Sequence, residues 1–278
     1  LGGGGYTKKI LESAPRNAIV IAIDRDVNAI EHSKKVLAGF GERVRFYKGN
    51  FSDIKNAAAE FDYEKVSGIV MDLGLSTYQL SSEDGFSYQR DTELDMRAGK
   101  EQGLTAKDVL NTYSEKEIAR ILFEYGEMRY SRQIAKEITI RRAEKKFNTT
   151  FDLVRLLEEK VPPRFLNSDL SRLFQAIRIE VNGELENLEK VLKDGADLLE
   201  ECGRIVAVSY HSLEDRIVKN SLRANEKLRV LTKKPLEPTE EETAVNVRAR
   251  SAKLRAAEKD SAAKTASKNK YQKSNLQK

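Results

Sequence analysis

The chain has 278 residues, of which 40% are hydrophobic and 33% charged, and its formal net charge at pH 7 is +5. It is long enough to bury a sizeable core, and it contains neither an apolar stretch of the roughly 20 residues that cross a bilayer nor the pattern of a signal peptide. Because it has one cysteine, Cys202, and two histidines, we expect a cytoplasmic protein with no disulfide framework and no metal site.

Four consecutive glycines, Gly2 to Gly5, precede a segment with helical character at residues 6–13. Glycine adopts backbone conformations that are closed to other residues, and it lets another molecule approach the main chain closely. A glycine cluster that opens a helix is therefore typical of a ligand cradle. A linker or an expression remnant is the alternative interpretation.

The next segments alternate between strand and helix. An apolar β-branched run ends at Asp24, and either Asp26 or Asn28 is placed to cap the helix that follows it. A strand at residues 44–47, the turn "KGNFSD", an alanine-rich helix and the apolar run "VSGIVMDLGLS", whose strand ends at Asp72, come next. Apolar runs of this kind predict a buried parallel sheet, and the alternation predicts a doubly wound α/β fold.

The pattern becomes helical between residues 104 and about 199. Ser114 and Glu117 fit a capping box, and "VPPRF" separates predicted helices at 151–160 and 168–181. A further helix at 185–199 runs up to "ECGR", where Gly203 is a candidate C-cap, and "RIVAVSYHS" returns to a buried strand. This order predicts a helical subdomain inserted between two strands, with an α/β domain at 1–76 and 184–258 and the insertion at 77–183.

The basic residues gather at the end of the chain. Residues 253–278 contain eight Lys or Arg and two Asp or Glu, so the rest of the chain carries a net charge of about −1. The stretch from 256 to 278 is poor in apolar residues, and we expect it to be disordered, with 259–278 as a basic tail. Such a tail attracts RNA or only improves solubility.

The glycines and the two strand-terminal acids suggest a binding site. In doubly wound sheets, ligands bind at the carboxyl ends of strands, where a glycine-rich turn leads into a helix and an acid about 20 residues later accepts ribose hydroxyls. Gly2 to Gly5 and Asp24 have that spacing. The strand that should precede the glycines is absent, so we expect the true amino terminus to lie ahead of Leu1. Together these features predict an adenosine-type ligand.

The glycine run favours one such ligand over another. A dinucleotide site usually shows G-x-G-x-x-G, which this chain lacks. S-adenosylmethionine has no pyrophosphate, so a looser glycine turn suffices for it. In "GNFSD", Phe51 would lie beside the adenine and stack on it, although a core position is the more ordinary role for a phenylalanine.

Eight stretches in one order then carry a resemblance to a known family. They are "LGGGG", "AIDRD", "GNFSD", "MDLGLS", "GFSYQRDTELDMR", "LFQAIRIEVNGEL", "YHSLEDRIVK" and "RARSAKLRAAE", and they extend from Leu1 to about Glu258. With them the chain resembles the RsmH (MraW) family. The resemblance implies a class I S-adenosylmethionine-dependent methyltransferase fold and methylation of the N4 amine of a cytidine in the decoding region of small-subunit (16S) ribosomal RNA.

The resemblance also implies a set of cofactor contacts, and the chain departs from the family pattern at several places, which include "LNSDLSRLFQ" and Val247 as well as two tyrosines. Tyr6 stands where the family usually has His, and Tyr78 stands where it usually has Pro, so the side-chain role of Tyr6 and the shape of the loop around Gln79 are open. Substrate positioning is less secure than cofactor binding for this reason. The implied cofactor-binding residues are Gly4, Gly5, Tyr6, Asp24, Phe51, Asp72 and Gln79.

Two residues are candidates for the chemistry. Asp72, at the end of its strand, would accept hydrogen bonds from the attacking amine, which favours the tetrahedral nitrogen of the transition state. The alternative is a capping carboxylate. His211, in "SYHSLED", would accept a proton or contact RNA, and the alternative is a ring held by its own hydrogen bonds.

A cationic helix face is the candidate RNA surface. Arg129, Arg132 and Lys136 share one helical face, with Tyr125 and Tyr130 close by and Arg141, Arg142, Lys145 and Lys146 beyond. Cations interleaved with aromatics suit single-stranded or distorted RNA, although a solvated helix face is an equal alternative. The expected partner is the small ribosomal subunit, and a homodimer is possible. The rival functions are a non-catalytic RNA-binding or ribosome-assembly factor and a nucleotide-dependent oxidoreductase.

Overall fold

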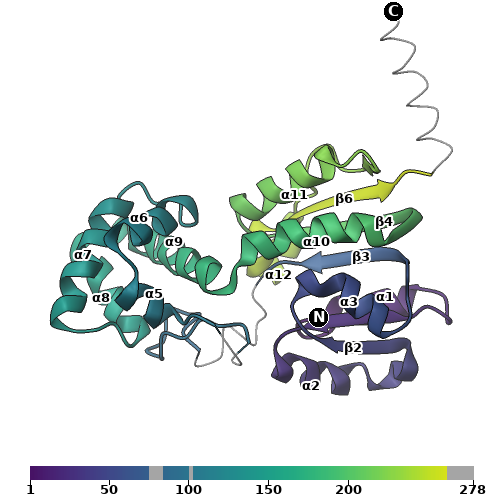
Figure 1. Cartoon of the computed structure of the whole chain (residues 1–278), viewed down its shortest axis with the longest axis horizontal. Helices are drawn as coiled ribbons and strands as arrows, with labels where there is room; N and C mark the ends of the chain where they lie inside the picture. The colour runs from purple at the N-terminus through teal and green to yellow at the C-terminus, as the bar shows by residue number, and fades with distance from the viewer. Residues whose placement is uncertain (75–83, 100–102, 262–278) are drawn as a thin grey trace, which may run out of the picture.

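The computed structural model describes residues 1–74, 84–99 and 103–261. Figure 1 shows two parts side by side, an α/β part that contains every strand and a part made of helices. A long pair of consecutive helices, α9 and α10, runs from one part into the other. In the described residues, no helix is both long and apolar enough to cross a membrane.

The strands form two sheets. β1 and β2 pair in parallel, and a second sheet has the order β3-β4-β6-β5, in which β3 and β4 are parallel while β6 is antiparallel to both of its neighbours. The strand that we expect ahead of Leu1 lies outside the sequence and stays a prediction. The strands are β1 (Val20–Asp24), β2 (Val44–Lys48), β3 (Val66–Asp72), β4 (Leu199–Ser209), β5 (Leu228–Val230) and β6 (Lys253–Lys259).

One prediction at the end of the chain is wrong. The chain adds β6, which returns antiparallel along β4 with Arg204 opposite Glu258 and makes this sheet mixed. Residues 256–259, expected to be disordered, belong to this strand. The sequence analysis missed this strand because of the charges in "KLRAAEK". Charged residues at both ends of the strand surround a short buried centre at residues 255–257. Residues 262–278 of the predicted tail lie outside the described part.

Apolar helix faces pack on the larger sheet and make the core of the α/β part. Leu188, Val191 and Leu192 of α10 lie buried in one cluster with Ile69 of β3 and Ile205 of β4. Burial of such side chains contributes about 1.5–3 kcal/mol each. The helices of this part are α1 (Gly5–Ser13), α2 (Val27–Val36), α3 (Ile54–Glu60), α10 (Glu184–Leu198), α11 (Ser212–Ala224) and α12 (Glu240–Val245), with 3-10 turns η1 (Ala38–Arg43), η2 (Phe51–Asp53) and η3 (Val247–Ser251).

Caps explain where several of these helices begin and end. Asp26 is the residue that caps α2, through a hydrogen bond that its carboxylate accepts from the Asn28 amide at 2.9 Å. The prediction that Gly203 caps α10 is wrong, because α10 ends at Leu198 and the chain continues directly into β4. Gly203 lies inside that strand instead, where an added Cβ would come within 2.9 Å of the Glu200 carbonyl oxygen.

The helical part has a core of its own, built from amphipathic helices. The predicted capping box of Ser114 and Glu117 is present at the start of α6. Pro163 occupies the first turn of α9, so this helix begins earlier than predicted, because proline is tolerated there. The helices are α5 (Ala106–Thr112), α6 (Glu115–Glu124), α7 (Ser131–Glu144), α8 (Thr150–Lys160) and α9 (Pro163–Asn182).

The junction between the two parts is a glycine kink with a polar anchor. Gly183, at φ 59°, ends α9 and precedes α10. The neighbouring Asn182 is buried. Its side-chain Nδ2 donates to the Met96 backbone carbonyl at 2.8 Å, and its side-chain Oδ1 accepts from the Ala98 backbone amide at 2.8 Å. The same oxygen lies 3.4 Å from the Arg25 guanidinium, at the end of β1. This one side chain thus ties the segment before α5, the junction and the α/β part together.

Candidate active site

The glycine run forms a turn that packs on one side and is open on the other. Gly4 has φ 82° and precedes α1, and a Cβ added there would lie 3.3 Å from Ser33 Oγ of α2. The Ser33 hydroxyl also donates to the Gly2 carbonyl at 2.8 Å. A Cβ added at Gly3 or Gly5 would meet nothing within 4 Å. The glycine turn is therefore an ordered part of the fold rather than a linker, and one of its faces is open.

Asp24 fastens this turn to the end of β1. Its carboxylate accepts the Gly2 amide at one oxygen and the Asp26 amide at the other, both at 2.9 Å. The Asp24 carbonyl accepts from the Gly49 amide, also at 2.9 Å, which brings in the turn after β2. Each carboxylate oxygen keeps a second lone pair. Asp24 therefore orders the first turn and still has acceptor capacity for a ligand hydroxyl.

Phe51 begins η2, directly after the turn that Asp24 holds. Asn50 caps this short helix by accepting the Ser52 amide at 3.0 Å. The Phe51 ring is partly buried and packs against the core of the larger sheet. This placement matches the ordinary core role, and stacking on an adenine stays a prediction.

Asp72 ends β3 and has a partner that the sequence analysis missed. The Tyr210 hydroxyl donates to Asp72 Oδ1 at 2.9 Å. Asp72 pairs with Val208 of β4 in the parallel register, so Tyr210 follows at the same edge of the sheet. The Tyr210 ring lies against Gly74, where an added Cβ would come within 2.7 Å of it. The available signal was that Tyr210 follows a buried parallel strand by one residue.

Electrostatic effects link Asp72 with residues from three other segments. Partial burial raises the pKa of Asp72, and the hydrogen bond from Tyr210 opposes that rise. Burial, followed by the charge of Asp72, raises the pKa of Tyr210. The pKa of Tyr6 in α1 is also raised, first by burial and then by the charges of Asp72 and of Glu242 in α12. Tyr6, directly after the glycine turn, therefore lies within range of the charges of Asp72 and of Glu242, and sequence reasoning did not assign α12 to this region.

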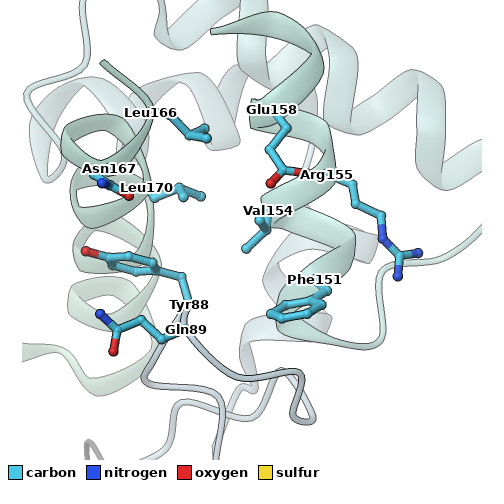
Figure 2. Close-up of a pocket in the computed structure, with 9 residues that line it drawn as sticks. All are labelled: Tyr88, Gln89, Phe151, Val154, Arg155, Glu158, Leu166, Asn167 and Leu170. Atoms are coloured by element: carbon cyan, nitrogen blue, oxygen red, sulfur yellow. The ribbon is translucent and has the colours of Figure 1, made fainter. Parts of the chain in front are cut away.

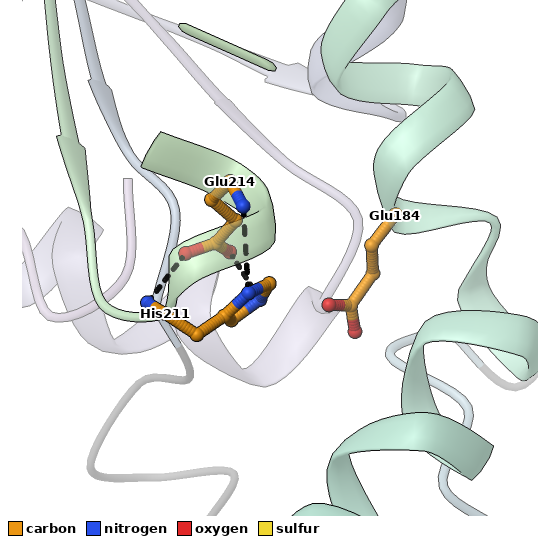
Figure 3. Close-up of side chains that lie close together, drawn as sticks. All are labelled: Glu184, His211 and Glu214. Carbon is orange, nitrogen blue, oxygen red and sulfur yellow. Dashed lines mark hydrogen bonds and ion pairs between the residues drawn. The ribbon is translucent and has the colours of Figure 1, made fainter. Parts of the chain in front are cut away.

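His211 is held in place as the N-cap of α11. Its Nδ1 accepts the Glu214 amide at 3.4 Å (Figure 3). The Glu214 carboxylate accepts the Tyr210 amide at 2.9 Å. Among the predicted alternatives, this geometry matches the ring fixed by its own hydrogen bonds. A role of His211 in proton transfer stays a prediction.

Figure 3 shows His211 beside the carboxylates of Glu214 and Glu184, whose donor atoms all lie within 4.8 Å of one another. Glu184 already accepts two hydrogen bonds from the Arg178 guanidinium, at 2.7 and 2.8 Å. Because His211 Nδ1 accepts an amide proton, the neutral ring carries its hydrogen on Nε2, which lies 3.2 Å from Glu214 Oε1. A ring in this tautomer carries a hydrogen on Nε2 and so offers no lone pair there to a metal.

The predicted cationic face is exposed. Arg129, Arg132 and Lys136 all point to solvent around the start of α7, and within the described residues none of them forms an ion pair. Two aromatic side chains close by in the sequence are also largely exposed, Tyr130 by 63% and Phe123 of α6 by 64%. Phe123 was missed because it is one of several apolar residues in the amphipathic pattern of α6. We call Arg129, Arg132, Lys136, Tyr130 and Phe123 the α7 surface.

The more distant cations of that stretch have structural partners instead. Arg141 pairs with Glu137 of its own helix at 3.0 Å and with Glu159 of α8, and Lys145 pairs with Asp152 of α8 at 3.1 Å. The Arg142 guanidinium donates to the carbonyls of residues 110 and 113 at the end of α5. These three cations hold helices together and do not extend the α7 surface.

Gln79 and Tyr78 lie outside the described residues. A cavity of about 520 Å³ lies between α8 and α9 in the helical part, and Figure 2 shows the side chains that surround it. None of its lining residues belongs to the glycine turn or to the ends of β1 and β3 that carry Asp24 and Asp72, so this cavity is separate from the candidate active site. It is lined by Tyr88, Gln89, Phe151, Val154, Arg155, Glu158, Leu166, Asn167 and Leu170.

Comparison with known proteins gives consistent findings. The model of a family described as the MraW methylase family matches residues 1–260. Proteins named ribosomal RNA small subunit methyltransferase H are similar over 93% of this chain: that of Carboxydothermus hydrogenoformans is 45% identical, with 89% of its length covered, and that of Thermotoga neapolitana is 47% identical, with 87% covered. A solved structure of a putative rRNA methylase from Clostridium thermocellum aligns with a TM-score of 0.43 and 12% identity, over 93% of this chain and 84% of the other.

Proposed function

The chain belongs to the MraW methylase family, and we propose that it transfers a methyl group from S-adenosylmethionine to the N4 amine of a cytidine in the decoding region of small-subunit (16S) ribosomal RNA. The names of its relatives support ribosomal RNA as the substrate class. The proposal is supported in this chain by two observations: Asp24, at the end of β1, holds the glycine turn, and Tyr6, directly after that turn, lies within range of the charge of Asp72 at the end of β3. We place the protein in the cytoplasm, with the small ribosomal subunit.

The open face of the glycine turn fits the cofactor. Space beside Gly3 and Gly5 that a Cβ would fill lets a ligand lie against the backbone, and Asp24 has acceptor capacity for ribose hydroxyls. The bound cofactor supplies an activated methyl group on a sulfonium. Tyr6 follows the turn and borders Asp72, so we assign its phenol to the wall between cofactor and base.

Asp72 is the group that we assign to the amine. The Tyr210 hydroxyl occupies Oδ1, which leaves Oδ2 to accept a hydrogen bond from the exocyclic N–H. That bond draws electron density toward the nitrogen as it becomes tetrahedral. The remaining task is alignment of amine and methyl group, which alone can contribute roughly 7–11 kcal/mol to lowering the barrier.

The α7 surface is the part that we assign to RNA. An enzyme that modifies a base must take it out of the stack, so the nucleotides around the target have to be held while the base enters the site. Unpaired cations contact phosphates, and exposed aromatic rings stack on bases. Arg129, Arg132 and Lys136 supply the first kind of contact, and Tyr130 and Phe123 the second.

The proposal is tested by mass analysis of nucleosides after small subunits from a strain lacking this protein are incubated with the pure chain and S-adenosylmethionine. We expect one new methylcytidine whose fragments place the methyl group on N4. Binding to subunits without any methylated nucleoside would instead favour the RNA-binding factor. Thermal stabilisation by a dinucleotide but not by S-adenosylhomocysteine would favour the oxidoreductase.

Alanine at Gly4 and at Gly5 should have opposite effects. Gly4 has φ 82° and close neighbours, so Gly4→Ala should cost about 1–3 kcal/mol of unfolding free energy. Gly5 begins α1 and faces open space, so Gly5→Ala should leave stability unchanged or higher but weaken S-adenosylhomocysteine binding about tenfold or more. Urea unfolding and calorimetric titration measure the two effects. Full affinity in Gly5→Ala would show that the cofactor does not use this face.

Removing the Tyr210 hydroxyl should move the acid side of the pH–rate profile. The hydrogen bond from Tyr210 lowers the pKa of Asp72, against the larger effect of burial. In Tyr210→Phe this opposing effect is lost, so the pKa of Asp72 rises further and the rate should begin to fall at a higher pH than in the wild type. Single-turnover rates at saturating subunits, measured as pH is lowered, test this. If the acid side of the pH–rate profile does not move in Tyr210→Phe, the ionisation of Asp72 does not control the rate.

A further inference from the structure

The helical part touches the α/β part at a second point, besides the covalent α9–α10 junction. Glu127, in the turn between α6 and α7, reaches the first turns of α11. Its Oε2 accepts the Ser212 hydroxyl at 2.6 Å, and its Oε1 lies 3.2 Å from the Arg216 guanidinium. These partners hold the pKa of Glu127 below its usual value, with the Ser212 hydrogen bond as the largest cause.

The turn is shaped to present this side chain. Glu127 has φ 49°, a left-handed conformation that a residue with a Cβ seldom adopts. Gly126 before it has no room for a side chain, since an added Cβ would lie 2.8 Å from the Leu122 carbonyl oxygen and 3.0 Å from that of Arg172. The Met128 amide closes the turn on Leu122 at 3.1 Å. The fold thus keeps an unfavourable backbone conformation at Glu127, the residue whose side chain contacts α11.

The contact joins the two surfaces that the proposed function needs. On one side, Arg129 and Tyr130 of the α7 surface follow Glu127 by two and three residues. On the other side, Ser212 directly follows Tyr210 and His211, and the Tyr210 hydroxyl holds Asp72. Few residues therefore separate the RNA-facing side chains from the group that faces the amine.

We propose that Glu127 is a positioning residue, which sets the orientation of the α7 surface relative to Asp72 through its contacts with Ser212 and Arg216. The inference rests on the proposed function. Among the described residues, the Arg178–Glu184 pair and the Asn182 anchor also connect the two parts, at the junction around Gly183. Glu127 adds a connection from the turn before α7 to α11, which does not pass through that junction.

The expected consequence is a loss of alignment without a loss of binding. A target base held by the α7 surface reaches the cofactor only when the two parts have the correct relative orientation, and a displacement of about 1 Å can cost about a hundredfold in rate. Glu127 does not touch the glycine turn, so cofactor affinity should not depend on it. Its ion pair with Arg216 is largely exposed, so stability should depend on it little.

The test compares Glu127→Gln with Glu124→Gln. The control removes an exposed ion pair, that of Glu124 with Arg120, from the end of the neighbouring α6, but this pair stays within the helical part. We expect Glu127→Gln to lower the single-turnover rate at saturating subunits about tenfold or more, with S-adenosylhomocysteine affinity and Tm as in the wild type. The control should keep the wild-type rate.

A charge exchange makes the assignment specific. Glu127→Arg combined with Arg216→Glu restores an ion pair with the opposite direction, and we expect it to recover much of the rate that Glu127→Arg alone loses. A wild-type rate in Glu127→Gln would overturn the inference, as would a rate loss matched by an equal loss in Glu124→Gln or in cofactor affinity. A normally folded double variant without recovery would also overturn it. If the wild-type chain itself methylates nothing, the proposed function fails, which is a different result.

Discussion

Replacing Asp72 with Asn is expected to lower methyl transfer by about a hundredfold to a thousandfold while leaving the protein at least as stable as the wild type. The rate falls because the amide presents a weaker, uncharged acceptor to the amine as its nitrogen becomes positive. The hydrogen bond from the Tyr210 hydroxyl can persist, since the carbonyl oxygen of the substituted side chain also accepts. The rate is measured with labelled cofactor on small subunits and the stability by thermal unfolding.

The direction of the stability effect follows from the raised pKa of Asp72. The folded protein binds this proton more tightly than the unfolded chain, whose Asp has a pKa near 3.8. The group therefore contributes stability below the unfolded pKa, and that contribution is lost as pH rises through the folded pKa. At neutral pH the ionised, partly buried carboxylate lowers the stability of the folded protein, and Asn removes this destabilisation.

The matched control for this variant is Asp62→Asn. Asp62 is exposed in a turn after α3 and has φ 63°, a conformation that Asn tolerates well. It should change neither rate nor stability. If Asp72→Asn keeps more than about a tenth of the wild-type rate, Asp72 is not the acceptor, and a clear fall in Tm would assign it the structural role of a capping carboxylate.

Reversing the three cations of the α7 surface is expected to weaken binding to small subunits by about a hundredfold or more. The variant carries Arg129→Glu, Arg132→Glu and Lys136→Glu. Each lost phosphate contact lowers the dependence of log K on log salt by about 0.7–0.9, so the slope should fall by roughly 2–3. Affinity for S-adenosylhomocysteine should not change, because these residues belong to the helical part. Filter binding at several salt concentrations measures the slope.

The control keeps the same change in net charge at other places. Lys35, Lys116 and Lys193 are exposed on α2, α6 and α10, and reversing them alters the whole-protein charge equally. If the control loses as much affinity as the α7 variant, binding depends on net charge alone. In that case Arg129, Arg132 and Lys136 form only a solvated helix face.

The sequence was sufficient to predict those parts of the site that lie at strand ends. Asp24 and Asp72 each follow an apolar run, and such runs are buried strands whose carboxyl ends form an edge. Capping residues such as Asp26 and Ser114 could also be predicted, because their hydrogen bonds are made to residues close by in the sequence. The resemblance to a family added the expectation of S-adenosylmethionine as the ligand, which the residue pattern alone only favoured.

The parts that could not be predicted depend on contacts distant in the sequence. Tyr210 meets Asp72 only through the pairing of β3 with β4, across 138 positions. Glu127 reaches α11 because of a left-handed backbone conformation that has no sequence pattern of its own when the residue is not glycine. β6 was missed because its buried centre is only three residues long between charged neighbours.

The departure at Tyr6 also has a physical consequence. The sequence left the role of this side chain open, and the structure places its phenol within reach of the charges of Asp72 and Glu242. A tyrosine here adds a hydroxyl and an aromatic face to the edge where cofactor and base are proposed to meet. The backbone of the glycine turn does not depend on that side chain, since its contacts are with Asp24 and Ser33.

The most direct measurement is a crystal structure of the chain with S-adenosylhomocysteine bound. The account predicts ligand density along the open face of Gly3 and Gly5, with the ribose hydroxyls on Asp24 and the sulfur directed toward Asp72. Density for the ligand at any other place, with the glycine turn and Asp72 both bare, would contradict it.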